Sequence, residues 1–397
     1  MRSDPSSPRP AAPRCASGFS LVELLVAMTL GLVLVLGMSS VYLFAKGAFS
    51  RQSQVSNIQQ SVRTAFEFLG NDARMIGHLG CFTGRGAPTN NLPATAIDTD
   101  YAVGVEGYEY DMGGAAYTIT SNSPANVATA ASWKANLAGT LIAGTFAIPV
   151  ATVSNNTATG NNGLTPGSDV LVIRTVVGAP VRLTADVAAA GATLALENIA
   201  GGLCSDGSTA KMSGFCANSH GLVASCAAAR VFKVNSIAGS ALTLGIGGTQ
   251  QFSKATSEVF PMQTIVYYVK RAGSGTSTSL YRRVFTGDPV AGVEQELIED
   301  VESMQVLYGR DTTAPDPDGA VDDYKTADQV TDWSRVVTIR MSLLLRSSTT
   351  AAGDVALAAS APVGDAVLNF PGGAKYDRRV LTSTVAIRNK IAYFQAP

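Results

Sequence analysis

The chain has 397 residues, enough for one large domain or two small ones behind a membrane anchor. Charged residues make up only 15% of it, and the formal net charge is -1. This composition lacks the basic footprint of a nucleic-acid-binding protein, so we expect no nucleic acid among its partners.

The amino terminus joins a polar segment to a long apolar run. Residues 1–17 contain four prolines and three arginines, whereas residues 19–45 carry one charged side chain, Glu23. A helix of about 27 residues would be about 40 Å long, more than the ~30 Å hydrocarbon core of a bilayer. We therefore predict that residues 19–45 span a membrane.

The order of these segments differs from that of a secretory signal, in which an apolar stretch of about 7 to 15 residues precedes the cleavage site. Here a cut at the end of the polar segment would leave the span on the mature protein. The acid within the span also needs an explanation, because intramembrane carboxylates are costly. Either Glu23 has a specific partner, or it reaches the headgroup region from the end of the span.

The residues from Gly18 to Glu23, GFSLVE, resemble the processing signature of type IV prepilins and pseudopilins. The resemblance implies that a membrane prepilin peptidase removes the leader, residues 1–18, and that Phe19 becomes the N-methylated first residue. It also implies that Glu23 pairs with the amino terminus of a neighbouring subunit; opposite charges attract far more strongly in low dielectric than in water. The amino terminus would lie in the cytoplasm and the rest of the chain in the periplasm.

After Ala45 the apolar residues recur every three or four positions, which indicates one face of an amphipathic helix. They are Val55, Ile58, Val62, Phe66, Leu69, Ala73 and Ile76. Because no proline falls between Pro13 and Pro88, residues 19–45 and 46–79 are predicted to form a single helix from Phe19 to about Gly77. The alternative is two helices broken at Gly47, although one glycine costs only ~1 kcal/mol.

Residues 80–397 are predicted to form an antiparallel β-rich domain, because short runs of β-branched and aromatic residues replace the helical spacing. Residues 264–270 and 279–285 should form a hairpin, and residues 337–346 alternate like a half-buried strand. Further strands are expected at residues 168–175, 230–234 and 378–389, whereas residues 86–165 have the composition of surface loops. The fold class is therefore α+β and pilin-like, with a long amino-terminal helix packed on this domain.

Removal of the leader takes Cys15 away and leaves Cys81, Cys204, Cys216 and Cys226. An even number of cysteines in an exported domain suggests disulfides, with three pairings open. Ring size favours Cys204 with Cys216, which leaves Cys81 to join the end of the helix to Cys226. With two histidines and no Cys-x-x-Cys spacing, we expect no zinc site, redox centre or other cofactor.

The acidic segment of residues 311–323 has part of the spacing of an EF-hand calcium loop. Asp316, Asp318 and Asp322 surround Gly319 in that spacing, but Ala314 and Lys325 occupy the first and twelfth positions, where carboxylates are expected. Two interpretations remain, a weak calcium site and a solvated acidic turn.

Segments spread from residue 18 to residue 390 follow the order seen in PilW-type minor pilins, among them IVYYVK followed by SLYRR, LIEDVESMQVLYG and DWSRVVTIRMSLLLRS. The resemblance implies a type IV pilus component near the fibre tip that primes assembly and supports twitching motility. Its partners would be other minor pilins, the major pilin, the inner membrane and a tip adhesin. The alternative is a J-like minor pseudopilin of a type II secretion system, which is typically much shorter.

Enzyme motifs such as G-x-S-x-G and H-E-x-x-H are missing from the sequence, so we predict no enzymatic activity.

Overall fold

The structure is a computed structural model that describes residues 20–82, 88–92, 101, 103–112, 116–118, 133–137, 140–143, 164–207, 209–245, 247–271, 277–289, 292–315, 317–347, 358–370 and 376–389. It divides into two compact units, Met1–Gln54 and Val55–Pro397. Gly18, Phe19, Cys15 and Asp316 lie outside the described residues.

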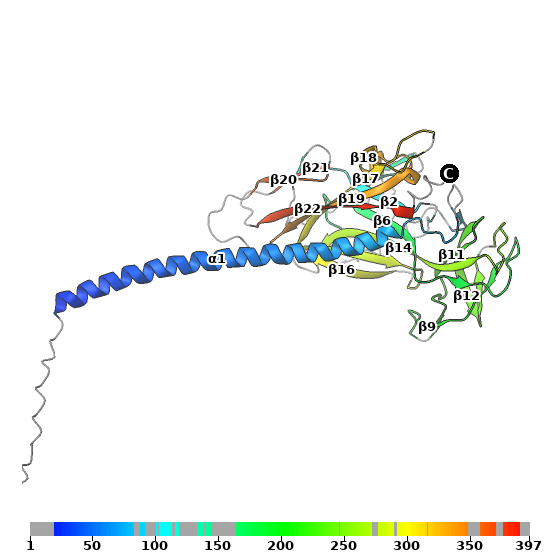
Figure 1. The fold of residues 1–397 in the computed structure, drawn as a ribbon, viewed down its shortest axis with the longest axis horizontal. Coiled ribbons are helices and arrows are strands. Elements are labelled where there is room, and N and C mark those ends of the chain that lie inside the picture. Colours follow the sequence, from blue (N-terminus) through cyan, green and yellow to red (C-terminus); the bar gives the residue numbers. More distant parts are fainter. Residues whose placement is uncertain are drawn as a thin grey trace, which may run out of the picture. The chain divides into compact units, whose positions relative to one another are not determined.

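One helix, α1 (Leu21–Arg74), runs through both the apolar and the amphipathic segment (Figure 1). The helix is continuous at Gly47, so the single-helix prediction is confirmed and the alternative break is wrong. It ends in a turn that closes at Gly77, whose φ of 74° is the left-handed conformation that commonly terminates helices.

The second unit contains two main β-sheets. The larger has 13 strands, and its path β5-β4-β2-β6-β14-β11-β12-β13-β8 is joined by β1, β7, β15 and β16. Its strands are β1 (Thr89–Asn90), β2 (Val105–Tyr110), β4 (Trp133–Leu137), β5 (Thr140–Ala143), β6 (Val170–Val176), β7 (Val181–Arg182), β8 (Thr193–Ala195), β11 (His220–Ala224), β12 (Ala229–Ala238), β13 (Ala241–Leu244), β14 (Glu258–Arg271), β15 (Thr278–Phe285) and β16 (Val293–Glu299). The predicted hairpin is β14 with β15, paired from Thr264↔Phe285 to Arg271↔Thr278.

The second main sheet has the order β18-β17-β19-β22 and is antiparallel throughout. Its strands are β17 (Val301–Arg310), β18 (Asp323–Lys325), β19 (Val336–Arg346) and β22 (Arg378–Ala386), with the 3-10 turns η2 (Ala327–Gln329) and η3 (Trp333–Arg335) between β18 and β19. Two small sheets complete the unit: β9 (Ala200–Leu203) with β10 (Ala210–Met212), and β3 (Ala116–Thr118) with β20 (Ser360–Val363) and β21 (Ala366–Asn369). The predicted α+β class is confirmed.

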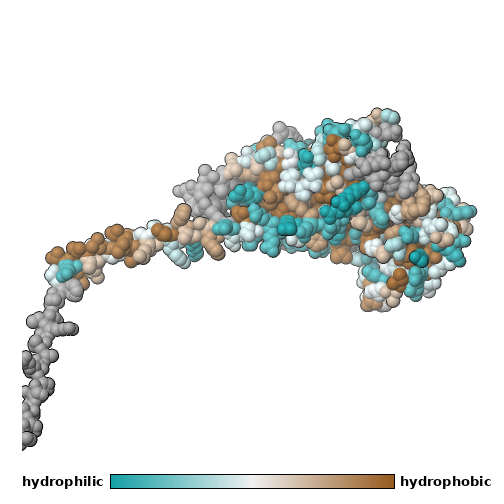
Figure 2. All heavy atoms as spheres, viewed as in Figure 1, coloured by the Kyte–Doolittle hydropathy of each residue, from teal (hydrophilic) through white to brown (hydrophobic). Residues whose placement is uncertain are grey.

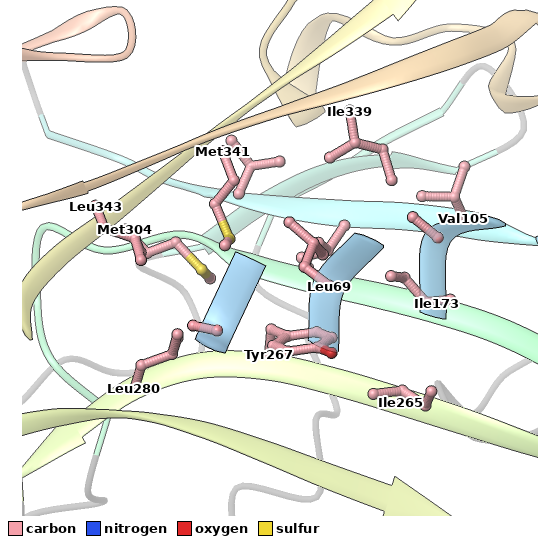
Figure 3. Packing of buried hydrophobic residues seen from close by; sticks show 14 of the residues in the cluster. Leu69, Val105, Ile173, Ile265, Tyr267, Leu280, Met304, Ile339, Met341 and Leu343 are labelled. Atoms are coloured by element: carbon pink, nitrogen blue, oxygen red, sulfur yellow. The ribbon is translucent and has the colours of Figure 1, made fainter. Parts of the chain in front are cut away.

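The amphipathic face of α1 forms the centre of the main hydrophobic core. Leu69 lies among side chains from both main sheets, with Tyr267 of β14 on one side and Met304 and Met341 of β17 and β19 on the other (Figure 3). The other buried helix residues in this cluster are Val62, Ala65, Ala73 and Ile76. Each buried aliphatic side chain of the size of Leu69 contributes about 1.5 to 3 kcal/mol, so the pattern read from the sequence fixes this half of the helix to the β domain.

The prediction that β19 is buried on one face only is wrong for its second half. Ile339, Met341 and Leu343 face the main core as expected. On the opposite face Ser342 is also buried, and Leu344 packs in a separate cluster with residues of β20 and β21. The small sheet therefore covers a face that the alternation alone assigns to solvent.

The expectation of surface loops across residues 86–165 is also wrong in part. Strand β2 pairs with β6 from Val105↔Ile173 to Tyr108↔Val170 inside the larger sheet. Its sequence, VEGYEY, contains two acids and a glycine, residue types that are uncommon in buried strands, so the strand was not predicted. The strand is stable there because Glu106 pairs with a buried arginine, Arg174.

Candidate assembly site

The amino-terminal half of α1 exposes its apolar side chains to the surroundings. Its most hydrophobic 18-residue window has a mean hydropathy of 2.4, and none of that window is buried. On the face drawn in Figure 2, this part of the helix is an almost continuous brown surface. Two hydroxyls along it bond within the helix: Thr29 Oγ1 donates to the Val26 carbonyl at 2.9 Å and Ser40 Oγ to the Gly37 carbonyl at 2.8 Å. By its length and composition, this part of α1 is able to cross a membrane.

Glu23 lies in the first turn of this helix. Ser20 caps that turn, because its Oγ accepts from the Glu23 backbone N–H at 3.2 Å and its carbonyl accepts from the Leu24 N–H at 3.1 Å. Within the part of the chain that the structure describes, the exposed Glu23 side chain makes no ion pair. The Glu23 carboxylate is thus available to a partner outside this chain. It lies five residues after Gly18, the predicted processing position.

The last turns of α1 are joined to the β domain by a charged contact. Asp72 accepts from Arg282 of β15 through both oxygens, from Nε at 2.8 Å and from Nη2 at 3.1 Å, and also from the Tyr267 hydroxyl at 2.5 Å. Burial alone would lower the pKa of the Arg282 guanidinium, but Asp72 raises it overall. Burial and the Asp72 charge raise the pKa of Tyr267 well above its usual value, so the tyrosine remains a donor.

The carboxyl end of the same helix is held by the far end of the chain. Asn389 Nδ2 donates to the carbonyls of Arg74 at 2.9 Å and Ile76 at 3.1 Å, and Thr175 Oγ1 donates to the Met75 carbonyl at 3.2 Å. These bonds satisfy carbonyls that a helix end leaves without partners. The end of α1 is therefore fixed by side chains that lie far from it in the sequence.

Two disulfides follow the pairing that ring size favours. Cys81 is bonded to Cys226, across 145 residues, and Cys204 to Cys216, across 12. The first ties the chain just after α1 to the β11–β12 connection. Among the described residues, one group of three His, Cys, Asp or Glu side chains lies close enough together to hold a metal ion: Cys204, Cys216 and Asp288. Both of its sulfurs are already used in the disulfide.

The acidic segment of residues 311–323 is organised by its own backbone. Asp322 Oδ2 accepts from the backbone N–H and the hydroxyl of Thr312 at 2.6 and 2.9 Å, and these bonds lower its pKa. Asp318 Oδ1 accepts from the Ala320 N–H at 2.8 Å, and the buried Asp311 accepts from the Gly319 N–H at 2.5 Å. Both described carboxylates of the candidate calcium set are therefore engaged locally, while Asp316 is not described.

Sequence reasoning missed a pair of acids between β2 and β6, the half-buried Glu109 and the buried Asp169. Glu109 is hydrogen-bonded to Asp169, which also accepts from the backbone N–H groups of Tyr110 at 3.0 Å and Val306 at 2.9 Å. Burial and the neighbouring Asp169 charge raise the pKa of Glu109 to about 11, so the pair holds a proton at neutral pH. An acid directly before the apolar run VLVIRTV was the only sequence signal for it.

Comparison with known families agrees with this geometry at both ends of the chain. Residues 13–39 match the prokaryotic N-terminal methylation motif, and residues 266–389 match type IV pilus-assembly protein W. The second match covers the end of β14, from Val266, and all the strands that follow it, including β17 and β19, which pack against α1. No curated protein and no solved structure matches the chain significantly. Together the apolar helix, its methylation motif and the carboxy-terminal match are those of a PilW-type pilin, to which the chain is similar over these residues.

Proposed function

We propose that this pilin is a minor pilin, which enters a type IV pilus through α1 and helps to prime assembly from the inner membrane. The observation that carries the proposal is the exposed carboxylate of Glu23, which lies on an uncovered apolar helix within the methylation motif. A charge in that place is costly in lipid unless it acquires a partner. Assembly supplies one.

In this proposal the prepilin peptidase cuts after Gly18 and the new amino terminus at Phe19 is methylated. A methylated amine keeps its positive charge, so Phe19 of one subunit can pair with Glu23 of the next. Attraction between the two charges is strong in the low dielectric of packed helices and offsets the desolvation of both groups. The same acid therefore disfavours the isolated subunit and favours the assembled one.

The β domain is proposed to be the part displayed by the fibre, at or near its tip. The helix turns from Val55 to Arg74 are clamped to that domain by the core around Leu69 and by the Asp72–Arg282 contact. Such a clamp supports a structural role, because it allows the domain to be carried by a docked helix without independent movement of these turns. We propose that this role involves neither enzymatic activity nor a cofactor.

The proposed topology has the amino terminus in the cytoplasm and the β domain in the periplasm, before the subunit leaves the membrane for the pilus at the cell surface. The partners are other minor pilins and the major pilin through α1, the prepilin peptidase at the leader, and a tip adhesin through the β domain. The two disulfides support an oxidising compartment for the domain.

A deletion strain tests the proposal against the J-like pseudopilin alternative. Surface pili and secreted enzymes are scored in the deletion, in the wild type and in the complemented strain. Loss of pili with secretion intact supports the minor pilin. Loss of secretion with normal pili would assign the chain to a type II secretion system instead.

A further inference from the structure

Arg230 is a charged side chain with no exposed surface. It lies in β12, where Phe232 and Val234 follow on the same face of the strand. Its cross-strand neighbour in β11 is Val223, and the next strand, β14, places Val259 opposite Val223. All four of these neighbours belong to one apolar cluster of the β domain, which also contains Phe252. The guanidinium carbon lies 5.4 Å from the centre of the Phe252 ring.

The guanidinium of Arg230 has donors but no acceptor. Its Nε, Nη1 and Nη2 are all buried, and none has a hydrogen-bond partner in the described structure. Burial lowers the pKa of this group, with no carboxylate opposing the effect. An arginine nevertheless keeps its proton in proteins, and the face of one aromatic ring does not replace the lost hydrogen bonds. A buried cation of this kind is stable only if an anion accompanies it.

The segment of residues 247–250 closes over the guanidinium at short range. A Cβ on Gly248 would overlap Arg230 Nη1, so only glycine permits this approach. The segment is fixed at both ends, because Asn91 Nδ2 donates to the Gly247 carbonyl at 3.1 Å and Gln250 Nε2 donates to the hydroxyl of Thr89. Thr89 is the residue paired with Arg230 between β1 and β12. The other amide atom of Gln250, Oε1, is also buried without a partner among the described residues.

We propose that Arg230 binds a small anion, either a carboxylate or an inorganic ion, beneath the segment of residues 247–250. The planar fork of a guanidinium matches two acceptor oxygens at once, and its hydrogen bonds to anions are short and strong. The close approach of Gly248 limits the ligand to a small one. The site lies outside residues 266–389, so the match to the pilus-assembly family does not account for it.

Thermal unfolding of the full-length protein in detergent tests this site. A bulky sulfonate buffer anion is replaced, at constant ionic strength and pH, by chloride, acetate or phosphate. At least one of the three should raise the midpoint of wild-type unfolding by about 2 °C or more, as expected when a ligand binds only the folded state. A rise with acetate identifies a carboxylate site, whereas a rise with chloride or phosphate alone identifies an inorganic one.

The variants separate this binding from general salt effects. Arg230→Met should unfold in sulfonate at or above the wild-type midpoint and lose the anion-dependent rise, because it removes the uncompensated charge while keeping the apolar length. Arg230→Lys keeps the charge without the fork and should show a smaller rise than wild type. Arg182→Met, at an exposed arginine of β7, should behave like wild type. An equal anion response in wild type and the Arg230 variants, or no response in wild type, would overturn the proposal.

Discussion

Asp72 and Arg282 join α1 to β15 through two hydrogen bonds, although 210 residues separate them in the chain. Both side chains are mostly buried, with exposed fractions of 13% and 15%. The pair therefore differs from the exposed Arg63–Glu67 contact on the same helix, in which both partners are largely in solvent.

Replacing Asp72 by Asn should destabilise the β domain strongly, because it leaves the Arg282 charge buried without compensation. Loss of one partner from such a pair costs about 3 to 5 kcal/mol when burial is complete, and we expect about 2 to 3 kcal/mol here because some exposure remains. Chemical denaturation measures the change. The matched control is Glu67→Gln, which should change stability by about 0.5 kcal/mol or less. Equal effects of the two substitutions would show that the buried Asp72–Arg282 contact contributes no more to stability than the exposed Arg63–Glu67 pair.

The acid pair of Glu109 and Asp169 should make stability depend on pH. Burial raises the pKa of Glu109 in the folded state to about 11, far above its value in an unfolded chain. The proton is thus bound more tightly in the folded state, and its contribution is complete in acid and declines as the pH rises towards the folded-state pKa. The charges of Asp328 and Asp365 act in the same direction.

The test of this pH dependence is Glu109→Gln, which keeps a neutral donor beside Asp169. Between pH 5 and pH 9, wild-type stability should fall by at most about 1.4 kcal/mol per pH unit relative to the variant, which lacks this titration. Thermal unfolding across that range provides the comparison. Parallel curves for the two proteins would mean that Glu109 does not hold the proton.

The disulfides should contribute unequally, since their ring sizes differ. In the chain-entropy model, closing the 145-residue separation between Cys81 and Cys226 contributes about 5 kcal/mol, against about 3 kcal/mol for the 12 residues between Cys204 and Cys216. The double serine variants of each pair, compared by denaturation, should follow that order. Thiol labelling of the denatured, unreduced wild type should detect no free cysteine among the four, and labelling of all four would exclude both bonds.

These features differ in how far the sequence could predict them. Helical spacing predicted the buried side of α1 because Leu69 and its neighbours repeat on one face, and alternation predicted the β14–β15 hairpin. Strand β2 was missed since its acids are stabilised by tertiary partners: Glu106 by Arg174 and Glu109 by Asp169. Ion pairs between distant segments, such as Asp72–Arg282, leave no periodic signal, and neither does the buried Arg230.

Processing should depend on Gly18, because a small residue lets the peptidase approach the backbone. Gly18→Val should retain the leader and so add the mass of 18 residues to the membrane-bound protein, as mass spectrometry or gel mobility can detect. Ser17→Ala, at the neighbouring leader position, is the control and should be processed normally. Protein of mature size in the Gly18→Val strain would contradict the predicted cut.

The central claim is that Glu23 pairs with a neighbouring subunit during assembly, and Glu23→Gln tests it most directly. Removing the charge while keeping the shape should leave anchoring intact, because a neutral amide is less costly in lipid than a carboxylate. Cleavage after Gly18 should also persist. We predict processed protein that stays in the inner membrane, with few or no pili by electron microscopy. Normal pili that contain the Glu23→Gln subunit would contradict the pairing and favour the alternative, in which Glu23 only reaches the headgroup region.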